Sequence, residues 1–287
     1  MTTFIEAEKA HYSEAALCRA LGVARSGVIA QRNKPEPSVR ETENAELAAK
    51  IRRVHLTHRG RYGSPRIFQQ LRIEGERVSE NRVARVMRSA GICAKTKRRF
   101  VRTTDSAHDH AVAPNLLKRE FTATAPNQVW VGDVTYLATD EGWAYLAVLI
   151  DLYARRVVGW ALEPTLATEL TLLALERAGS SRVPGSALVH HTDRGSNYCA
   201  DDYQAALRRL NITPSMSRVG DCWDNAVAES FFATLKRELG DTFPSRSEAN
   251  RSVGAFIHYY NLTRLHSTNN YQSPVQRELA FEARLAA

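Results

Sequence analysis

The sequence contains few cysteines and no long hydrophobic run. Its four cysteines, at positions 18, 93, 199 and 222, are scattered and form no C-x-x-C pair. This spacing argues against a zinc ribbon and against a disulfide framework, and it fits a reducing cytoplasm. The longest apolar run, AYLAVLI at 144–150, is far shorter than the ~20 residues that a membrane-spanning helix needs.

Targeting signals and repeats are also lacking. The N-terminus has no basic segment followed by an apolar one, so the sequence predicts no signal peptide. There is neither an internal repeat nor a low-complexity tract. With 287 residues, 44% of them hydrophobic and 24% charged, the composition is ordinary for a globular protein and the length favours two domains. We therefore expect a cytoplasmic protein without a membrane segment.

The net charge of +8 is unevenly distributed along the chain. Residues 1–120 contain 24 Lys and Arg against 13 Asp and Glu, whereas residues 121–287 contain 15 against 18. A basic surface can serve solubility alone. A positive surplus this large, confined to one part of the chain, is more typical of a nucleic-acid-binding face.

The first third of the chain shows helical patterns. In residues 14–32, Gly22 separates two short helical segments whose apolar seam is formed by Leu17, Leu21, Val23 and Val28. Glycine allows the chain to reverse in such a turn, so the segment is similar to a helix-turn-helix. A plain helical packing unit explains the same pattern about equally well.

A second group of helices is predicted at 43–57, 62–75 and 78–92, with Pro65 suited to a first helical turn. Between residues 81 and 104 there are eight basic residues and no acidic one. A solvated helix normally mixes charges of both signs, so we favour contact with DNA phosphates. The candidate DNA contacts in this stretch are Arg82, Arg85, Arg88, Lys95, Lys97, Arg98 and Arg99.

After a polar linker that includes a possible docking element, NLLKREF, the hydrophobic period changes at about residue 128. Strands are predicted at 128–139, 142–153, 155–162, 186–191 and 212–217, and helices at 167–179, 200–210, 224–239 and 247–261. Trp130, Trp143 and Trp160 fall at expected core positions of the strands. This order predicts an α/β fold in which one mixed five-stranded sheet has helices on both faces.

Three acidic residues could meet at one end of this sheet. Asp133 lies within the first strand, Asp193 follows the fourth strand, and Glu229 lies on the helix that comes next. If the first and fourth strands are parallel neighbours, their carboxylates come together. Converging carboxylates repel one another without a cation, and their hard oxygen ligands favour Mg²⁺ or Mn²⁺. Two such ions can catalyse phosphodiester chemistry.

Several residues near these acids have competing interpretations. Asp221 and Asp224 are rival third acids, although their place at a helix start favours capping. Asp151 ends a strand, and we interpret it as a structural cap or ion-pair partner. His191 could approach the metal site, but a packed strand histidine is the simpler interpretation, whereas Trp223 could touch DNA.

The motifs along the whole chain resemble those of one transposase family. VWVGDVTYL, DLYARRVVGWAL, HTDRGSNY, GDCWDNAVAESFFATLKREL and YYNLTRLHSTNNYQSP occur in the order found in second-frame products of bacterial insertion sequences of the IS-three type. The spacing of 35 residues between Asp193 and Glu229 also matches. The chain resembles retroviral integrases more distantly. One departure is Asn269-Asn270, where a Leu-Gly pair is usual.

The resemblance implies an RNase H-like catalytic core with Asp133, Asp193 and Glu229 as its catalytic, metal-binding acids. It further implies that Lys236 contacts DNA and that Arg194, Gly195 and Asn225 shape the site. The implied reaction is metal-dependent cleavage and strand transfer at the terminal inverted repeats, through a circular intermediate. Implied partners are terminal and target DNA, further copies of the chain, and a first-frame protein. The implied location is the bacterial nucleoid.

These patterns together predict five segments. They are a helix-turn-helix-like segment (1–40), a basic DNA-binding domain (41–102), a linker (103–126), the catalytic core (127–240) and a helical extension (241–287). Two other functions fit parts of the sequence. One is a DNA-binding regulator without catalytic chemistry, and the other is a lone metal-dependent nuclease of the RNase H type. Three acids at the family spacing argue against the first, and the DNA-reading helices argue against the second.

Overall fold

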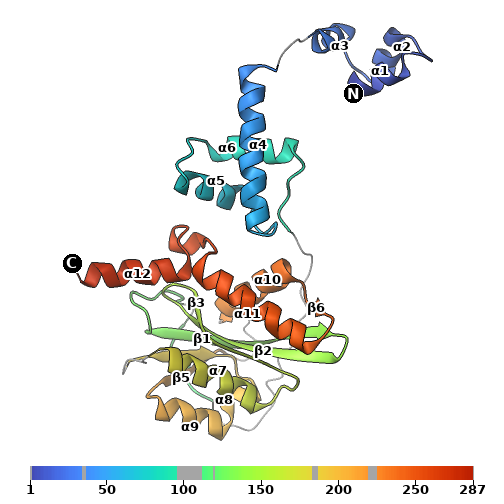
Figure 1. Cartoon of the computed structure of the whole chain (residues 1–287). Coiled ribbons are helices and arrows are strands. Elements are labelled where there is room, and N and C mark those ends of the chain that lie inside the picture. The colour runs from blue at the N-terminus through green and yellow to red at the C-terminus, as the bar shows by residue number, and fades with distance from the viewer. Residues whose placement is uncertain are drawn as a thin grey trace. The chain divides into compact units, whose positions relative to one another are not determined.

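The computed structural model describes residues 2–33, 37–95, 112–118, 120–182, 187–218 and 225–286. It divides into two compact units, Met1–Ala94 and Lys95–Ala287. The first unit contains helices only among its described residues, and the second contains the sheet (Figure 1). Each unit has its own hydrophobic core, so each is described separately.

The first three helices form a small cluster. They are α1 (Thr2–Glu8), α2 (Glu14–Ala20) and α3 (Arg25–Arg32). Gly22 has φ +64° in the turn between α2 and α3, a conformation that favours glycine and produces the predicted reversal of the chain. Leu17 and Val28 are buried in the cluster core, as expected. The expectation for Leu21 is wrong, because its side chain remains 37% exposed.

The next three helices pack against one another. They are α4 (Val39–Thr57), α5 (Ser64–Ile73) and α6 (Glu80–Ser89). Ser38 and Glu41 form a capping box at the start of α4, and Pro65 occupies the first turn of α5 as predicted. The helices share an apolar core of Leu47, Ile51, Val54, Ile67, Leu71, Val83, Val86 and Met87.

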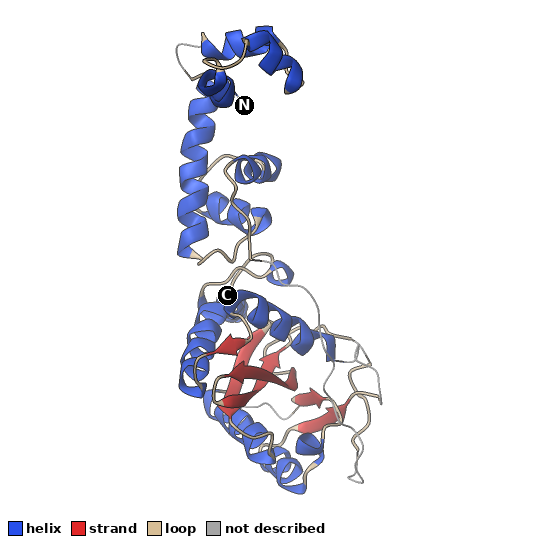
Figure 2. Cartoon of the chain, turned by 90° about the vertical axis from the view of Figure 1, so that its right-hand side faces the viewer, coloured by secondary structure: helices blue, strands red, loops and turns tan. Residues whose placement is uncertain are grey.

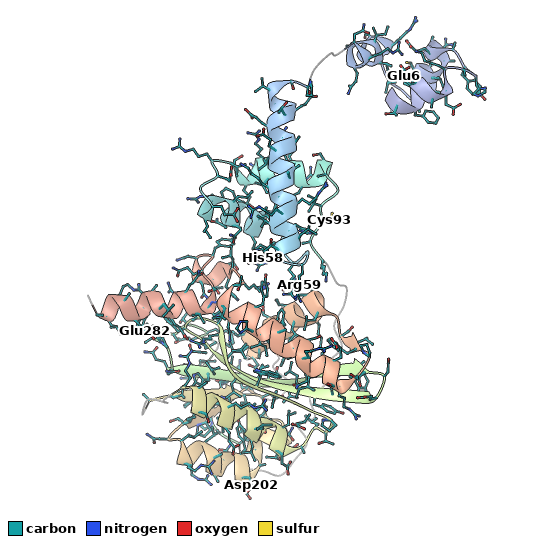
Figure 3. All side chains as sticks on the ribbon, viewed as in Figure 1. Glu6, His58, Arg59, Cys93, Asp202 and Glu282 are labelled. Carbon is teal, nitrogen blue, oxygen red and sulfur yellow. The ribbon has the colours of Figure 1, made fainter. Side chains whose placement is uncertain are left out.

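His58 caps the end of α4 and is buried (Figure 3). Its ring stacks on Tyr62 at 3.8 Å between centroids. Burial and the charge of Arg61 lower the pKa of His58 from 6.5 to about 4. A histidine held neutral in the fold binds a proton more readily when the chain unfolds.

Acidification is therefore expected to destabilise the helical unit. Between pH 6.5 and about pH 4 the unfolded chain binds more protons at His58 than the folded chain, so the free energy of unfolding falls as the pH falls through this window. The change His58→Phe keeps an aromatic ring on Tyr62 but cannot bind a proton. Thermal unfolding of the full chain followed by circular dichroism should show a weaker pH dependence for this variant. Identical pH dependence would contradict the account.

The second unit is built on a mixed sheet. Its strands are β1 (Val129–Thr139), β2 (Gly142–Asp151), β3 (Arg156–Glu163), β4 (Val189–Thr192) and β5 (Thr213–Met216), in the order β3-β2-β1-β4-β5. β1 pairs antiparallel with β2 and parallel with β4, so the predicted neighbourhood of the first and fourth strands is confirmed. The short strand β6 (Thr242–Phe243), which was not predicted, pairs with the far end of β1.

Helices cover both faces of this sheet, as the element order predicted (Figure 2). α10 (Ala226–Leu239) and α11 (Arg246–Leu262) lie on one face. α7 (Thr168–Ser181), α8 (Ser196–Cys199) and α9 (Asp201–Arg209) lie on the other. Leu137, Phe231 and Phe256 belong to the first core, and Trp130 and Leu175 to the second. The sheet thus holds the ends of β1 and β4 rigidly between two apolar layers.

Two expectations for the second unit need comment. Trp130 is buried and Trp160 is half-buried, but the expectation for Trp143 is wrong, because its side chain is 51% exposed. It lies at the outer end of β2, where Arg246 at the start of α11 contacts its carbonyl but leaves the indole ring partly uncovered. The predicted docking element packs on the core: Leu117 is buried and the Leu116 backbone N–H donates to Ser215 Oγ at 2.9 Å.

The chain after α11 is fastened to β3 by polar side chains. η2 (Ser267–Asn269) and α12 (Pro274–Leu285) follow α11. Asn269 is buried and its Nδ2 donates to the Ala154 carbonyl at 2.6 Å. Asn270 adopts φ +52°, which asparagine tolerates better than most residues, so it can stand at the position where the resemblance leads us to expect glycine. Glu278 of α12 is buried and forms ion pairs with Arg156 and Arg182.

Candidate active site

Two of the predicted acids lie at the same end of neighbouring parallel strands. Val131 of β1 pairs with His191 of β4. Asp133 and Asp193 each stand two residues farther along, so the parallel register brings them level with one another. β4 ends at Thr192, which places Asp193 in the loop beyond the sheet while Asp133 remains within β1.

The loop after β4 holds Asp193 in place. The Gly195 backbone N–H donates to Asp193 Oδ1 at 3.0 Å. A Cβ atom at Gly195 would lie 3.1 Å from the same oxygen, so glycine leaves room for the carboxylate. Arg194 Nε donates to the Ser217 carbonyl at 2.7 Å and ties this loop to the residue that follows β5. Arg194 and Gly195 therefore shape the surroundings of Asp193.

Asn225 connects the start of α10 to β1. It is buried, and its Nδ2 donates to the Gly132 carbonyl at 3.1 Å, directly beside Asp133. Within the described part of the chain, Asn225 Oδ1 has no hydrogen-bond partner. Glu229 and Lys236 follow Asn225 by one and three turns, so they occupy roughly the same face of α10. Glu229 is exposed, and the Lys236 ammonium lies 4.6 Å from the centre of the Tyr136 ring.

The electrostatics link all three acids. Burial and the negative charge of Asp193 raise the pKa of Asp133 well above its usual range, and the charge of Glu229 adds to this effect. The Val134 backbone N–H, which donates to Asp133 Oδ1 at 2.8 Å, opposes the shift. Among the described residues, no three His, Cys, Asp or Glu side chains are grouped closely enough to hold a metal ion. Asp133 and Asp193 are thus the more strongly interacting pair, and Glu229 acts on Asp133 more weakly.

A buried aromatic layer lies behind Asp133 and Asp193. His190 contacts the Tyr203 hydroxyl at 2.8 Å, and the Tyr198 ring packs on Tyr203. Burial and the charges of Tyr203, Asp133 and Asp193 raise the pKa of Tyr198 well above its usual range. Sequence reasoning did not single out Tyr198, although it ends the HTDRGSNY motif. Its proximity to both acids was visible only once α8 had been placed.

Comparison with known proteins identifies the family. The integrase core domain family matches residues 123–222, a second integrase core domain family matches residues 210–274, and the HTH-like domain family matches residues 41–100. The InsF transposase of insertion sequence IS3A from Escherichia coli K12 is 41% identical over 279 residues, which cover 96% of this chain and 97% of that protein. The chain belongs to the IS3 family of transposases. It is accordingly a transposase with an integrase core, which places it among the polynucleotidyl transferases.

Two further comparisons accompany this assignment of the transposase. A 31 kDa protein of insertion element IS600 from Shigella sonnei is 42% identical over 261 residues, covering 90% of this chain and 96% of that protein. Among solved structures, the simian T-cell lymphotropic virus intasome in complex with PP2A regulatory subunit B56 gamma aligns with a TM-score of 0.48 and 16% identity, over 80% of this chain and 74% of that chain.

The basic residues predicted to contact DNA are in different situations. Arg82 of α6 binds Glu43 at 2.8 Å and Asn44 at 3.1 Å, both on α4, so it joins two helices of the transposase. Arg85, Arg88 and Lys95 are exposed. Of the residues singled out in the sequence, six lie outside the described part of the chain: Lys97, Arg98, Arg99, Asp221, Trp223 and Asp224.

Asp151 and His191 take the structural roles that were favoured for them. Asp151 is buried and accepts hydrogen bonds from the backbone N–H groups of Asn127 at 2.6 Å and Tyr153 at 2.9 Å. His191 is buried in β4, where its Nδ1 contacts Ser215 Oγ at 2.8 Å. Both residues therefore support the sheet of the transposase near the acids.

Gly132 is the position where an added methyl group should damage the site most. A Cβ atom there would lie 2.6 Å from His190 Cε1, and this ring is fixed by Tyr203. Gly132→Ala should push β4 away from β1 and misplace Asp193 relative to Asp133. We expect a loss of about 1–3 kcal/mol in the free energy of unfolding and a roughly 10²-fold loss of DNA cleavage.

The control for this prediction is Gly159→Ala, on β3, which lies two strands away from β1. A Cβ atom there would lie 2.3 Å from the Ala174 carbonyl oxygen, so this variant is also overpacked. Cleavage per folded molecule, measured beside thermal unfolding, should fall only in Gly132→Ala. Equal losses of cleavage in the two variants would show that the effect is one of general stability.

Proposed function

We propose that Asp133, Asp193 and Glu229 are the catalytic acids of this transposase and that they bind Mg²⁺ or Mn²⁺, two ions in all. The observation that carries the proposal is the parallel register of β1 and β4, which brings Asp133 and Asp193 level at one end of the sheet. The charges of Asp193 and Glu229 accordingly raise the pKa of Asp133. Carboxylates that raise one another's pKa are relieved by a cation, and an all-oxygen ligand set favours these hard metals. The oxygen ligands of these residues suit such ions, and metal binding would bring the three carboxylates closer together than they lie among the described residues.

Each neighbouring residue has a role in holding this arrangement. The N–H of Gly195 fixes the orientation of the Asp193 carboxylate, and Asn225 fixes the start of the helix that carries Glu229. Lys236, on roughly the same helical face as Glu229, would contact a DNA phosphate. When bound, the ions supply activation of the attacking oxygen and stabilisation of the leaving oxygen in phosphodiester chemistry.

The reaction we propose consists of two displacements at phosphorus. In the first, a water oxygen attacks the phosphate at each end of the element, and the bond to the 3′ oxygen breaks to release a 3′ hydroxyl. In the second, this 3′ hydroxyl gives up its proton and attacks the phosphorus of another phosphodiester. The 3′ oxygen of the attacked strand leaves and takes up a proton, so one phosphodiester bond forms as another breaks. Joining one end of the element to the other by this step gives a circular intermediate.

The DNA partners would be the terminal inverted repeats and the target. Arg85, Arg88 and Lys95 are exposed and suited to phosphate contact, and we assign Arg82, Lys97, Arg98 and Arg99 to the same basic stretch. Because two ends must be paired, we expect a homo-oligomer on DNA, associated with the bacterial nucleoid. None of the described helices is both long and apolar enough to cross a membrane. Sedimentation of the chain on paired ends should show more than one copy, and a strict monomer would contradict this.

The proposed reaction is tested with labelled DNA that carries the element's own ends. In the presence of Mg²⁺, the chain should nick the 3′ end of the element and form joined products. If it binds this DNA without cutting it, the first-frame protein is added, since family members are also made as a fusion of both frames. Binding without cleavage under both conditions would show a DNA-binding regulator instead of an enzyme.

A further inference from the structure

An exposed tryptophan lies at the outer end of the β1–β2 hairpin. Trp143 is 51% exposed, although the neighbouring residues of β2 from Leu146 to Asp151 are all buried. Tryptophan carries one of the largest apolar surfaces of any side chain, so leaving half of it in water forgoes stabilisation. The position therefore suggests a contact that forms only when a partner binds.

Trp143 is connected to the predicted DNA contact on α10 by a single ring. The rings of Trp143 and Tyr136 meet edge to face at 4.9 Å between centroids. The Lys236 ammonium lies 4.6 Å from the centre of the same Tyr136 ring. Lys236, Tyr136 and Trp143 thus form a continuous row of contacts. The row begins at Lys236, on roughly the same face of α10 as Glu229.

The chemistry of this row favours a nucleic-acid base as the occupant at Trp143. Lys236 provides a positive charge for a phosphate, and the indole face provides a stacking surface. The turn itself carries Asp140 and Glu141, and Glu141 accepts a hydrogen bond from the Arg246 backbone N–H at 2.9 Å. The Arg246 side chain lies on the same tip, where its Nε donates to the Trp143 carbonyl at 3.2 Å. Its charge is offset by the two acids, so stacking on the ring, not charge, would retain the base.

The register of the sheet gives the distance from the acids. Trp143 pairs with Ala138, which lies five residues beyond Asp133 on β1. At the usual rise of a strand this is about 17 Å, which corresponds to about five base pairs of duplex DNA. The base would therefore belong to the DNA close to the reacting phosphate.

We propose that Trp143, supported by Tyr136, is a stacking surface for a DNA base that leaves the duplex stack within about five base pairs of the reacting phosphate. This inference rests on the proposed function, because it takes the DNA at the three acids as its substrate. The base could come from the element end or from the target, and both present the same flat ring.

The test measures DNA affinity of the full chain at one fixed salt concentration by fluorescence anisotropy. Trp143→Ala should bind about 5- to 150-fold more weakly, whereas Trp143→Phe should retain most of the affinity. The matched control is Leu166→Ala, since Leu166 is 52% exposed in the same unit but offers no aromatic ring. Equal affinity of wild type and Trp143→Ala, or an equal loss in Leu166→Ala, would overturn the proposal.

A scan with abasic nucleotides identifies the base. At one position near the reacting phosphate, removing the base should lower the DNA affinity of wild type by the same factor as the change Trp143→Ala does. The same removal should leave the DNA affinity of the Trp143→Ala variant unchanged. The scan is run separately on element-end DNA and on target DNA, so the responding duplex shows the source. If the loss of affinity from the missing base and the loss from Trp143→Ala add at every position, the proposal is overturned. A cleavage assay of wild type and Glu229→Gln is run alongside. Cleavage by wild type but not by Glu229→Gln would support the proposed function whatever the binding measurements show for Trp143.

Discussion

Replacing any one of the three acids by its amide is expected to abolish DNA cleavage while DNA binding is retained. Asp133→Asn, Asp193→Asn and Glu229→Gln each remove a negative charge without changing the volume of the side chain. If the acids hold the ions that stabilise the transition state, losing several kcal/mol of that stabilisation lowers the rate by about 10³-fold or more. Gel analysis of labelled element ends at saturating Mg²⁺ measures the rate, and anisotropy measures binding.

Two comparisons make this prediction specific. Asp202→Asn is the matched control, because Asp202 lies in the exposed first turn of α9 (Figure 3) and should leave cleavage unchanged. In the absence of metal, Asp133→Asn should raise the free energy of unfolding, because burial and neighbouring charges disfavour the ionised carboxylate. If one of these three variants cleaves DNA at the wild-type rate, the acid that it replaces is not catalytic.

Removing one partner of the buried ion pair between α10 and the segment after α11 is expected to destabilise the second unit strongly. Arg264 and Glu238 are 2% and 3% exposed, and Arg264 Nη2 lies 2.8 Å from Glu238 Oε1. Removing one partner leaves the other charge buried without its counter-ion. Glu238→Gln should therefore cost about 3–5 kcal/mol in the free energy of unfolding.

A double variant separates the charge from the packing. Arg264→Met combined with Glu238→Leu replaces both charges by apolar side chains of similar length, and such replacements of buried pairs are often neutral. Urea unfolding should show the double variant closer to wild type than Glu238→Gln is. A loss below about 1 kcal/mol in Glu238→Gln would mean that the pair behaves like an exposed one.

The core of the fold could be predicted from local patterns in the sequence. β-branched alternation marked β1, two further apolar runs marked β2 and β3, and helical periodicity marked α7, α10 and α11. The order of elements allowed the parallel pairing of β1 with β4. These features sufficed to expect Asp133 and Asp193 at one end of the sheet.

Other features depend on contacts between residues distant in the sequence. β6 has two residues, too few for any period, and it exists because β1 offers a free edge. The role of Glu278 arises from Arg156 and Arg182, which lie about a hundred residues earlier in the chain. The exposure of Trp143 could not be predicted either, since the apolar run of β2 that follows it is buried on both faces and gives no sign that its first residues are exposed.

The most direct test of the central claim is diffraction at the manganese absorption edge from crystals of the chain with element-end DNA and Mn²⁺. We expect anomalous density for two ions in contact with the carboxylates of Asp133, Asp193 and Glu229. Manganese bound elsewhere, or density that touches Asp133 and Asp193 while Glu229 remains apart, would contradict the assignment of these three residues as one metal site.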